Sequence, residues 1–385
     1  MLELAVKGNK WYWGWLVVLL GVIGAGFGLY LMQLKFGLGI TGMSRDVSWG
    51  FYIANFTYLV GVAAGGVMVV LPYYLHDYKA YGKITILGEF LAIASIVMCL
   101  LFILVDLGQP MRALNVLLYP TPNSVLFYDA IVLNGYLFLN LVIGWNVLEA
   151  ERNGVHYQSW LKPLIYISIP WAVSIHTVTA YLYCGLPGRH FWLTAVLAPR
   201  FLASAFAAGP ALLILLCLFI RRFTNFDPGR QQIQTLAKTV AYAICINVFF
   251  FLCEVFVAFY SQIPGHTTHL KYLFVGLHGH GALVPWMWGS MILMVIGIVL
   301  TVTPATRKNE TSLAIACIVI IMGTWIDKGL GMISGGFVPN PMHEVNEYIP
   351  TVPEIGITLG VYAIGALVLT VLYKMAVGVK EEVHG

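Results

Sequence analysis

Apolar runs of about 20 residues recur along the whole chain, and this is the length that crosses the hydrocarbon core of a membrane as a helix. In hydrocarbon every backbone N–H and C=O must be paired within the protein, and a helix achieves this inside one segment. Of the 385 residues, 59% are hydrophobic and 10% are charged, less than half of the share of about 25% that soluble domains carry. The sequence therefore predicts an all-α integral membrane protein with many spans.

We expect about ten transmembrane helices. The first apolar run follows Lys7 and Lys10 like a signal peptide, but it continues to Gln33, which is too long for a cleaved segment. It is therefore predicted to be a retained span. The ten expected spans are residues 11–33, 50–74, 84–106, 124–148, 163–184, 200–220, 239–261, 282–304, 312–333 and 354–375.

The orientation follows from the Lys and Arg residues of the connections. Fourteen of the 21 lie on the side of both termini, and seven lie on the other side. Because cytoplasmic loops carry the excess of Lys and Arg, both termini are predicted to be cytoplasmic, in a multi-pass protein of the cytoplasmic (inner) membrane. The basic residues sit in short loops, so the net charge of +4 does not indicate nucleic-acid binding.

Cysteine and histidine spacing gives no support for a metal or haem held by this chain. The six cysteines lie in or beside apolar runs without a CxxC pair, which argues against cluster ligation and disulfides. His176 is the one histidine well inside an expected span, and four others cluster near one outer loop: His266, His269, His278 and His280. Haem and zinc remain the less favoured alternatives. Proton handling, or hydrogen bonding to a quinone, is the favoured role for the outer histidines.

Loop lengths suggest a division into two helical groups. Spans 2–5 and 6–9 would each form a four-helix bundle, with spans 1 and 10 flanking them. We expect an N-terminal flanking helix and outer loop at 1–48, a first bundle with the candidate site at 49–185, and a second bundle at 186–334. The outer loop, last helix and cytoplasmic tail would occupy 335–385.

Ionisable residues inside the spans are the strongest functional signal, because a charge in hydrocarbon is costly unless it is paired or useful. Asp106 and Asp129 flank a proline-rich loop that also contains Arg112. Glu254 lies deep in span 7, and His176 lies near the middle of span 5. An ion pair between Asp106 and Arg112 that only fixes the loop is an open alternative, as is a core role for His176.

Three further ionisable residues lie within the spans. Glu89 is near the cytoplasmic end of span 3, and Asp327 and Lys328 lie late in span 9. Two adjacent residues of a helix point about 100° apart, so Asp327 and Lys328 each need a partner on another span.

The outer ends of spans 2 and 4 have the side chains that a quinone headgroup requires. A flat apolar ring with two carbonyls needs aromatic walls, hydrogen-bond donors and a proton path. Span 2 offers Trp49, Tyr52 and Asn55, and span 4 offers Tyr128 and Asp129 at the same depth. We therefore predict a quinone site there.

Three motifs resemble the polysulfide reductase membrane-subunit family of NrfD/PsrC type: WGFYIANFTYLVGVAAGG at 49–66, DLGQPMR at 106–112, and LAPRFLASAFAAGPAL at 197–212. Gln109 departs from the Arg that is common in the second motif. Within the family, the segments SRDVSWGFYIA, SIPWAVSIHTVTA, GLHGHGALVPWMW and WIDKGLGM are most similar to DsrP-type subunits of DsrMKJOP complexes, which are linked to sulfate and sulfite reduction.

The resemblance implies a subunit that exchanges electrons between menaquinol and an extracytoplasmic iron–sulfur partner, in an oxidoreductase complex, with no haem or cluster of its own. Trp49, Tyr52, Asn55 and Tyr128 would line the menaquinone site, and Arg112 would order the adjacent loop. The partners implied are a DsrO-like iron–sulfur subunit, a DsrJ-like multihaem cytochrome c, a DsrM-like haem b subunit and a DsrK-like cytoplasmic iron–sulfur subunit.

In this interpretation Asp106 and Asp129 exchange protons beside the quinone. Glu254, His176 and Asp327 form a second proton route through the other bundle.

Two alternative functions belong to other classes of membrane protein. A secondary transporter would have duplicated bundles with broken helices facing each other at the membrane midplane. A cofactor-free membrane anchor would only dock soluble redox subunits.

Overall fold

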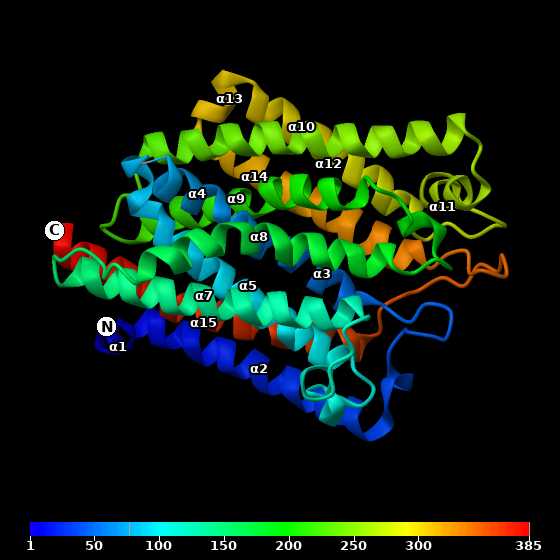
Figure 1. The fold of residues 1–385 in the computed structure, drawn as a ribbon, viewed down its shortest axis with the longest axis horizontal. Coiled ribbons are helices and arrows are strands. Elements are labelled where there is room, and N and C mark those ends of the chain that lie inside the picture. Colours follow the sequence, from blue (N-terminus) through cyan, green and yellow to red (C-terminus); the bar gives the residue numbers. More distant parts are fainter. Residues whose placement is uncertain (77, 385) are drawn as a thin grey trace.

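The computed structural model describes residues 1–76 and 78–384, and within this part every regular element is helical. In these two described ranges, ten helices are long and apolar enough to cross a membrane. They run up and down roughly parallel to one another (Figure 1). The fold class and the ten spans predicted from the sequence are confirmed.

The spanning helices, several of them with a short continuation, are α2 (Lys10–Phe36), α3 (Phe51–Gly65) with α4 (Val67–Leu75), α5 (Gly82–Asp106), α7 (Val125–Arg152), α8 (Leu161–Cys184), α9 (Leu197–Phe223), α10 (Arg230–Tyr260), α12 (Val284–Val302), α14 (Glu310–Trp325) with η5 (Ile326–Ser334), and α15 (Val352–His384). Short helices are α1 (Leu2–Val6), α6 (Asn115–Leu118), α11 (Pro264–Phe274) and α13 (Pro304–Lys308). Single turns are η1 (Leu38–Ile40), η2 (Lys79–Tyr81), η3 (Pro110–Arg112) and η4 (His190–Trp192).

Most helix ends lie within a few residues of the predicted spans, and two differ more. Helix α10 begins at Arg230 instead of residue 239, and α15 continues to His384 instead of residue 375. The α10 extension is mostly polar, and the α15 extension starts with the apolar residues 376–379 and ends in polar ones; both remain helical. Hydropathy detects the part of a helix that contacts lipid, and it does not detect the polar turns that extend it.

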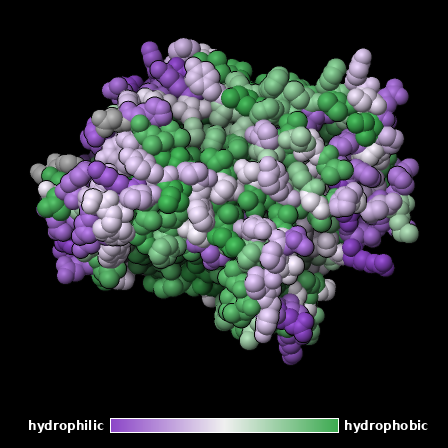
Figure 2. All heavy atoms as spheres, in the orientation of Figure 1, coloured by the Kyte–Doolittle hydropathy of each residue, from purple (hydrophilic) through white to green (hydrophobic). Residues whose placement is uncertain are grey.

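The two ends of the molecule differ. Both chain termini lie at one end, here called the terminal end, and the long connections gather at the other, here called the loop end (Figure 1). Hydrophobic side chains form a broad band between the ends, and hydrophilic side chains concentrate at the ends themselves (Figure 2). This distribution fits a membrane-spanning protein.

Helices α3 and α9 cross closely at the centre. A methyl group on Gly65 would lie 2.7 Å from the Cα of Gly209, so both backbones need glycine there. Helix α3 also packs against α5, α8 and η5, and it is buried almost all round. The predicted bundles at 49–185 and 186–334 therefore meet along a tight helix crossing.

The flanking helices α2 and α15 pair with each other. A methyl group on Gly26 would lie 2.7 Å from the Cα of Gly360. Helix α15 also packs on α5 and α7, which fixes the α2–α15 pair on the flank of the first predicted bundle.

Segment η5 is a π-helix that continues α14. Such wider turns are rare and occur frequently at functional sites. This one contains Asp327 and Lys328, and all nine of its residues are buried.

Candidate functional site

At the loop end, four aromatic rings surround the start of α3. Trp49 stacks on Trp192 with 5.9 Å between ring centroids, and it meets Tyr183 and Phe337 edge-on at 5.7 and 5.8 Å. The Arg189 guanidinium lies 4.4 Å from the Phe337 ring centroid and donates to the Phe337 carbonyl at 3.1 Å. The rings come from three separate parts of the chain, so together they hold the loop end in place. We call Trp49, Tyr183, Trp192 and Phe337 the aromatic cluster.

Asp129 lies within electrostatic range of Tyr183 in this cluster and is only 1% exposed. Its Oδ1 accepts a hydrogen bond of 2.6 Å from Thr179 Oγ1 of α8. Tyr183 lies close enough to be influenced by the charge of Asp129, and its hydroxyl bonds to the hydroxyl of Thr57 in α3. The result is a buried carboxyl group with one donor, beside aromatic rings, which is an arrangement suited to proton exchange.

Asp106 ends α5 at the same end of the molecule. Its Oδ1 is buried and has no hydrogen-bond partner among the residues that the structure describes. Arg112 is exposed on η3, and no ion pair joins it to Asp106 in the described chain. The alternative in which these two residues form a loop-fixing pair is therefore wrong, because the loop carries Arg112 to the surface.

The other predicted quinone contacts lie in three different places. The Tyr52 hydroxyl donates to Gln33 Oε1 at 2.8 Å, and Gln33 Nε2 donates to the Val105 carbonyl at 2.6 Å, next to Asp106. Tyr128 is 47% exposed on the outside of α7. The structure thus places Trp49 in the aromatic cluster and Asp129 within electrostatic range of it. It places Tyr52 close to Asp106 and leaves Tyr128 at the surface.

Asn55 lies deeper in α3 and faces α14 and α15. Its Oδ1 accepts from Trp325 Nε1 at 3.0 Å and from the Tyr362 hydroxyl at 2.8 Å. Its Nδ2 donates to the Phe51 carbonyl at 2.7 Å. These bonds tie three helices together.

Glu354 is a buried carboxylate that sequence reasoning missed. It accepts hydrogen bonds from the Gly42 amide at 2.8 Å and from the Tyr348 hydroxyl at 2.5 Å. Burial and the nearby Glu354 raise the pKa of Tyr348, so its hydroxyl stays protonated and can donate. Glu354 opens the last span, where a carboxylate normally lies at the surface, so its position in the chain does not indicate burial.

The second predicted bundle contains a buried ion cluster centred on Arg200 of α9. Its Nη2 lies 2.7 and 2.8 Å from the two carboxylate oxygens of Asp327, and its Nη1 donates to Glu254. The guanidinium also lies 5.0 Å from the Phe251 ring centroid. Glu254 and Asp327 were predicted as site residues from the sequence, but Arg200, which joins them, was not.

Lys328 connects this cluster to the first predicted bundle. Its Nζ lies 2.5 Å from Nε2 of His176 in α8, and 3.0 Å from Ser204 Oγ in α9. A methyl group on Gly61 would lie 3.2 Å from the same Nζ, so glycine provides the necessary space in α3. As expected from their adjacency, Asp327 and Lys328 each take a partner on another helix, Arg200 of α9 for Asp327 and His176 of α8 for Lys328.

A small cavity of about 10 Å³ lies between the two halves of this network. Arg200, Asp327, Lys328 and Asn247 line it, and the buried Asn247 Oδ1 has no hydrogen-bond partner in the described chain. This volume is at the lower limit for one water molecule. We call Arg200, Glu254, Asp327, Lys328 and His176 the buried charge network.

The outer histidines do not converge. His269 Nδ1 lies 2.6 Å from the Val338 carbonyl, and His280 Nδ1 lies 3.4 Å from Glu347. Burial lowers the pKa of His269 to about 4. Among the described residues, no group of three or more His, Cys, Asp or Glu side chains could hold a metal ion.

Comparison with known proteins gives a consistent result. The family described as polysulphide reductase, NrfD, matches residues 39–338. A putative membrane subunit of dimethyl sulfoxide reductase from Halobacterium salinarum is 26% identical, over 92% of this chain and 89% of its own.

Two further relatives have quinones in their names. The menaquinone reductase integral membrane subunit of Nitratidesulfovibrio vulgaris is 20% identical, over 91% of this chain and 88% of its own. The Hdr-like menaquinol oxidoreductase integral membrane subunit of Archaeoglobus fulgidus is 24% identical, over 63% of this chain and 60% of its own.

Proposed function

This chain belongs to the NrfD family of polysulphide reductase membrane subunits, and from that premise we propose that it is the quinone-interacting membrane subunit of a respiratory redox complex. Its substrate is menaquinol or menaquinone, which two of the relatives carry in their names. The observation that supports this most directly is Asp129, a buried carboxyl group held by Thr179 beside the aromatic cluster.

Quinone chemistry needs both a flat apolar surface and proton exchange at the carbonyl oxygens. In this proposal Trp49 and the aromatic cluster contact the ring, and Asp129 and Asp106 exchange its protons. Tyr52 positions the end of α5 through Gln33, and Asn55 holds α3 against α14 and α15. Tyr128 and Arg112, both exposed at the loop end, meet the quinone as it arrives from the membrane.

Electrons pass to or from partners, because we assign no redox group to this chain. The loop end faces outward and docks an extracytoplasmic iron–sulfur subunit, and both termini are cytoplasmic. The fuller assembly has a multihaem cytochrome c, a haem b subunit and a cytoplasmic iron–sulfur subunit, as in DsrMKJOP complexes linked to sulfite reduction. The buried charge network forms a second proton route, with Glu254, Asp327 and His176 as its titrating groups.

The test is binding of the fluorescent quinone-site inhibitor HOQNO to the purified assembly. Wild type should bind saturably, and Asp129→Asn should lose binding. Thr179→Val should weaken binding about tenfold, because a hydrogen bond to a charged group contributes about 1.5 kcal/mol. Thr177→Val is the matched control, since Thr177 lies on the same helix and, among the described residues, its hydroxyl bonds only to the Val173 carbonyl.

Three outcomes would contradict the proposal. Inhibitor binding that is unaffected by Asp129→Asn would move the quinone site elsewhere in the chain. Absence of binding to wild type would favour the anchor alternative, and substrate accumulation in vesicles without redox partners would favour the transporter.

A further inference from the structure

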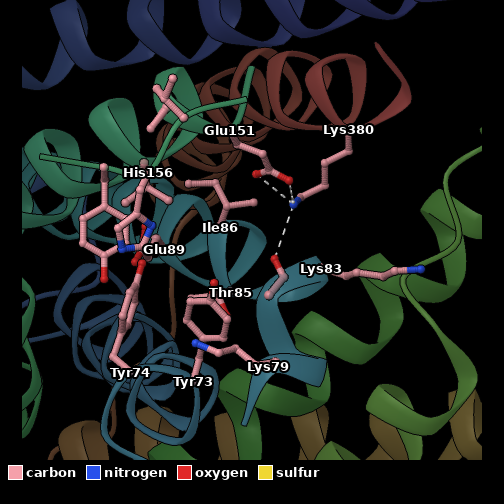
Figure 3. Close-up of a pocket in the computed structure, with 15 residues that line it drawn as sticks. Tyr73, Tyr74, Lys79, Lys83, Thr85, Ile86, Glu89, Glu151, His156 and Lys380 are labelled. Atoms are coloured by element: carbon pink, nitrogen blue, oxygen red, sulfur yellow. Dashed lines mark hydrogen bonds and ion pairs between the residues drawn. The ribbon is translucent and has the colours of Figure 1, made fainter. Parts of the chain in front are cut away.

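A second cavity lies at the terminal end, far from the aromatic cluster. It is half-open, its volume is about 340 Å³, and it is lined by α4, α5, α7, α15 and their connections (Figure 3). One water molecule needs about 10–15 Å³ by this kind of measure, so the cavity has room for a cluster of waters. Nothing in the proposed function uses it.

Glu89 of α5 lines this cavity and is only 3% exposed. Its Oε2 is buried and has no hydrogen-bond partner among the described residues. Within the same part of the chain it forms no ion pair, unlike Glu254 and Asp327, which share Arg200. An unpaired ionised carboxylate in an apolar interior is very costly, so such a group is stabilised by water or by taking up a proton.

The buried cation of the cavity is bonded to groups other than Glu89. Lys380 Nζ of α15 bonds both Glu151 carboxylate oxygens, at 2.8 and 3.1 Å, and the Gly82 carbonyl at 3.3 Å (Figure 3). Tyr74 lies within electrostatic range of Glu89. The other titratable groups that line the cavity are Tyr73, Lys79, Lys83, His156 and Tyr157. Glu89 therefore faces a cavity with a polar wall, in which water can reach it.

Polar groups continue from Glu89 along α7 toward the loop end. Tyr136 is fully surrounded by protein, shares a hydrogen bond with Asn140, and lies within electrostatic range of Glu89. It follows Asp129 by seven residues, which is about two helical turns or roughly 10 Å on the same face. Cys99 of α5 lies within electrostatic range of Asp129.

We propose that this cavity is an aqueous vestibule at the terminal end and that Glu89 exchanges protons between its water and the quinone-linked carboxyl group of Asp129. A hydronium ion in the cavity gives a proton to the Glu89 carboxylate and becomes water. The protonated carboxyl then releases the proton inward, and the reverse sequence carries a proton outward. The destination, Asp129, rests on the proposed function, whereas the vestibule and Glu89 rest on their own geometry.

The first test is carbodiimide labelling of the wild-type complex, followed by mass spectrometry. Dicyclohexylcarbodiimide modifies protonated carboxyl groups in apolar surroundings, so it should label Glu89, and more strongly at acidic than at alkaline pH. Glu382 is the control carboxylate at the same end, because it is exposed and paired with Arg152 at 3.2 Å. Absence of an adduct on Glu89, or equal labelling of Glu382, would overturn the proposal.

The second test separates proton exchange from quinone binding. Glu89→Gln should keep HOQNO affinity and slow quinone-linked turnover about 100-fold, the usual lower range for loss of a proton-transfer group. Glu89→Asp should restore much of the rate, and Glu382→Gln should leave it unchanged. Wild-type turnover in Glu89→Gln would refute the inference.

Two further results have separate meanings. Failure of the wild type to bind HOQNO would remove the proposed function, while the labelling would still decide whether Glu89 takes up protons from the cavity. Labelling that appears only after phospholipid is extracted would show that the cavity holds a lipid headgroup instead of water, which also overturns the vestibule.

Discussion

Arg200 lies between the buried carboxylate of Asp327 and the partly buried carboxylate of Glu254, so one guanidinium pairs with both acids. The sequence indicated both acids, because a carboxylate inside a membrane span is unusual whatever its partner is. It did not identify Arg200, which stands at the start of an expected span and was counted as a loop charge. Only the tertiary structure brings α9, α10 and η5 together, so the partner could not be read from any one helix.

Replacing Arg200 tests the energetic role of this pairing. Arg200→Met should destabilise the protein by about 3–5 kcal/mol, because it removes the guanidinium that pairs with both Glu254 and Asp327. Arg152→Met is the control, since its pair with Glu382 is exposed and such pairs contribute about 0–1 kcal/mol. The measurement is unfolding of both variants in the same detergent. Equal destabilisation would show that the ion pairs of Arg200 contribute no more to the free energy of unfolding than the exposed pair of Arg152 does.

The quinone residues illustrate a different limit at the residue scale. Trp49, Tyr52 and Asn55 come from one helix end and were predicted to act together. Because side chains on a helix point in different directions, Tyr52 bonds toward α2, Asn55 toward α14 and α15, and Trp49 toward the aromatic cluster. A sequence predicts which residues lie at the same depth in the membrane. The side chains that each residue contacts depend on which neighbouring helix it faces.

At the scale of elements, hydropathy predicted the ten spans because membrane thickness sets the length of an apolar helix. It could not predict the π-helical segment η5, whose residues read as an ordinary continuation of α14. The small residues of spans 2 and 6 also suggested close packing. The contact of Gly65 with Gly209 confirms that interpretation.

The helix crossing gives a matched pair of glycine variants. Gly65→Ala should destabilise the protein by about 1–3 kcal/mol, because the added methyl meets the backbone of α9. Gly21→Ala on α2 is the control, since nothing lies within 4 Å of the added methyl group. That variant should be neutral or stabilising by up to about 1 kcal/mol, because alanine favours helix. The measurement is the thermal unfolding temperature of both variants. A larger decrease for Gly21→Ala than for Gly65→Ala would contradict this expectation.

Helix α11 should respond to acid through His269. Its pKa falls from the ordinary 6.5 to about 4 in the folded state, because burial disfavours the charged ring. Between pH 6.5 and about 4 the unfolded segment therefore binds more protons than the folded one. The stability that the neutral, buried His269 contributes is thus fully present above about pH 6.5 and is lost as the pH falls toward 4. The protection of the α11 amides against hydrogen exchange, measured relative to their intrinsic exchange rate at each pH, should fall over that window, and His269→Gln should remove this dependence. An identical acid response in the variant would exclude His269 as the cause.

At the scale of the whole molecule, the two ends differ in charge more than the sequence indicated. Arg200 and Lys328 were both counted on the side opposite the termini, but both are buried among the helices. The loop end thus exposes fewer basic residues than expected, while the terminal end keeps Arg221, Arg222 and Arg230 close together. This strengthens the asymmetry that the positive-inside rule uses.

The orientation can be measured directly in the native membrane. If the terminal end is cytoplasmic, a green fluorescent protein fused after residue 385 should fluoresce, and alkaline phosphatase inserted in the loop between α6 and α7 should be active. Replacing Arg221, Arg222 and Arg230 by Gln should weaken this preference, because the cluster supplies much of the charge difference. An inactive phosphatase beside a non-fluorescent tail would reverse the orientation. It would also place the Glu89 vestibule outside and the aromatic cluster inside, so the partner that exchanges electrons would have to dock from the cytoplasm.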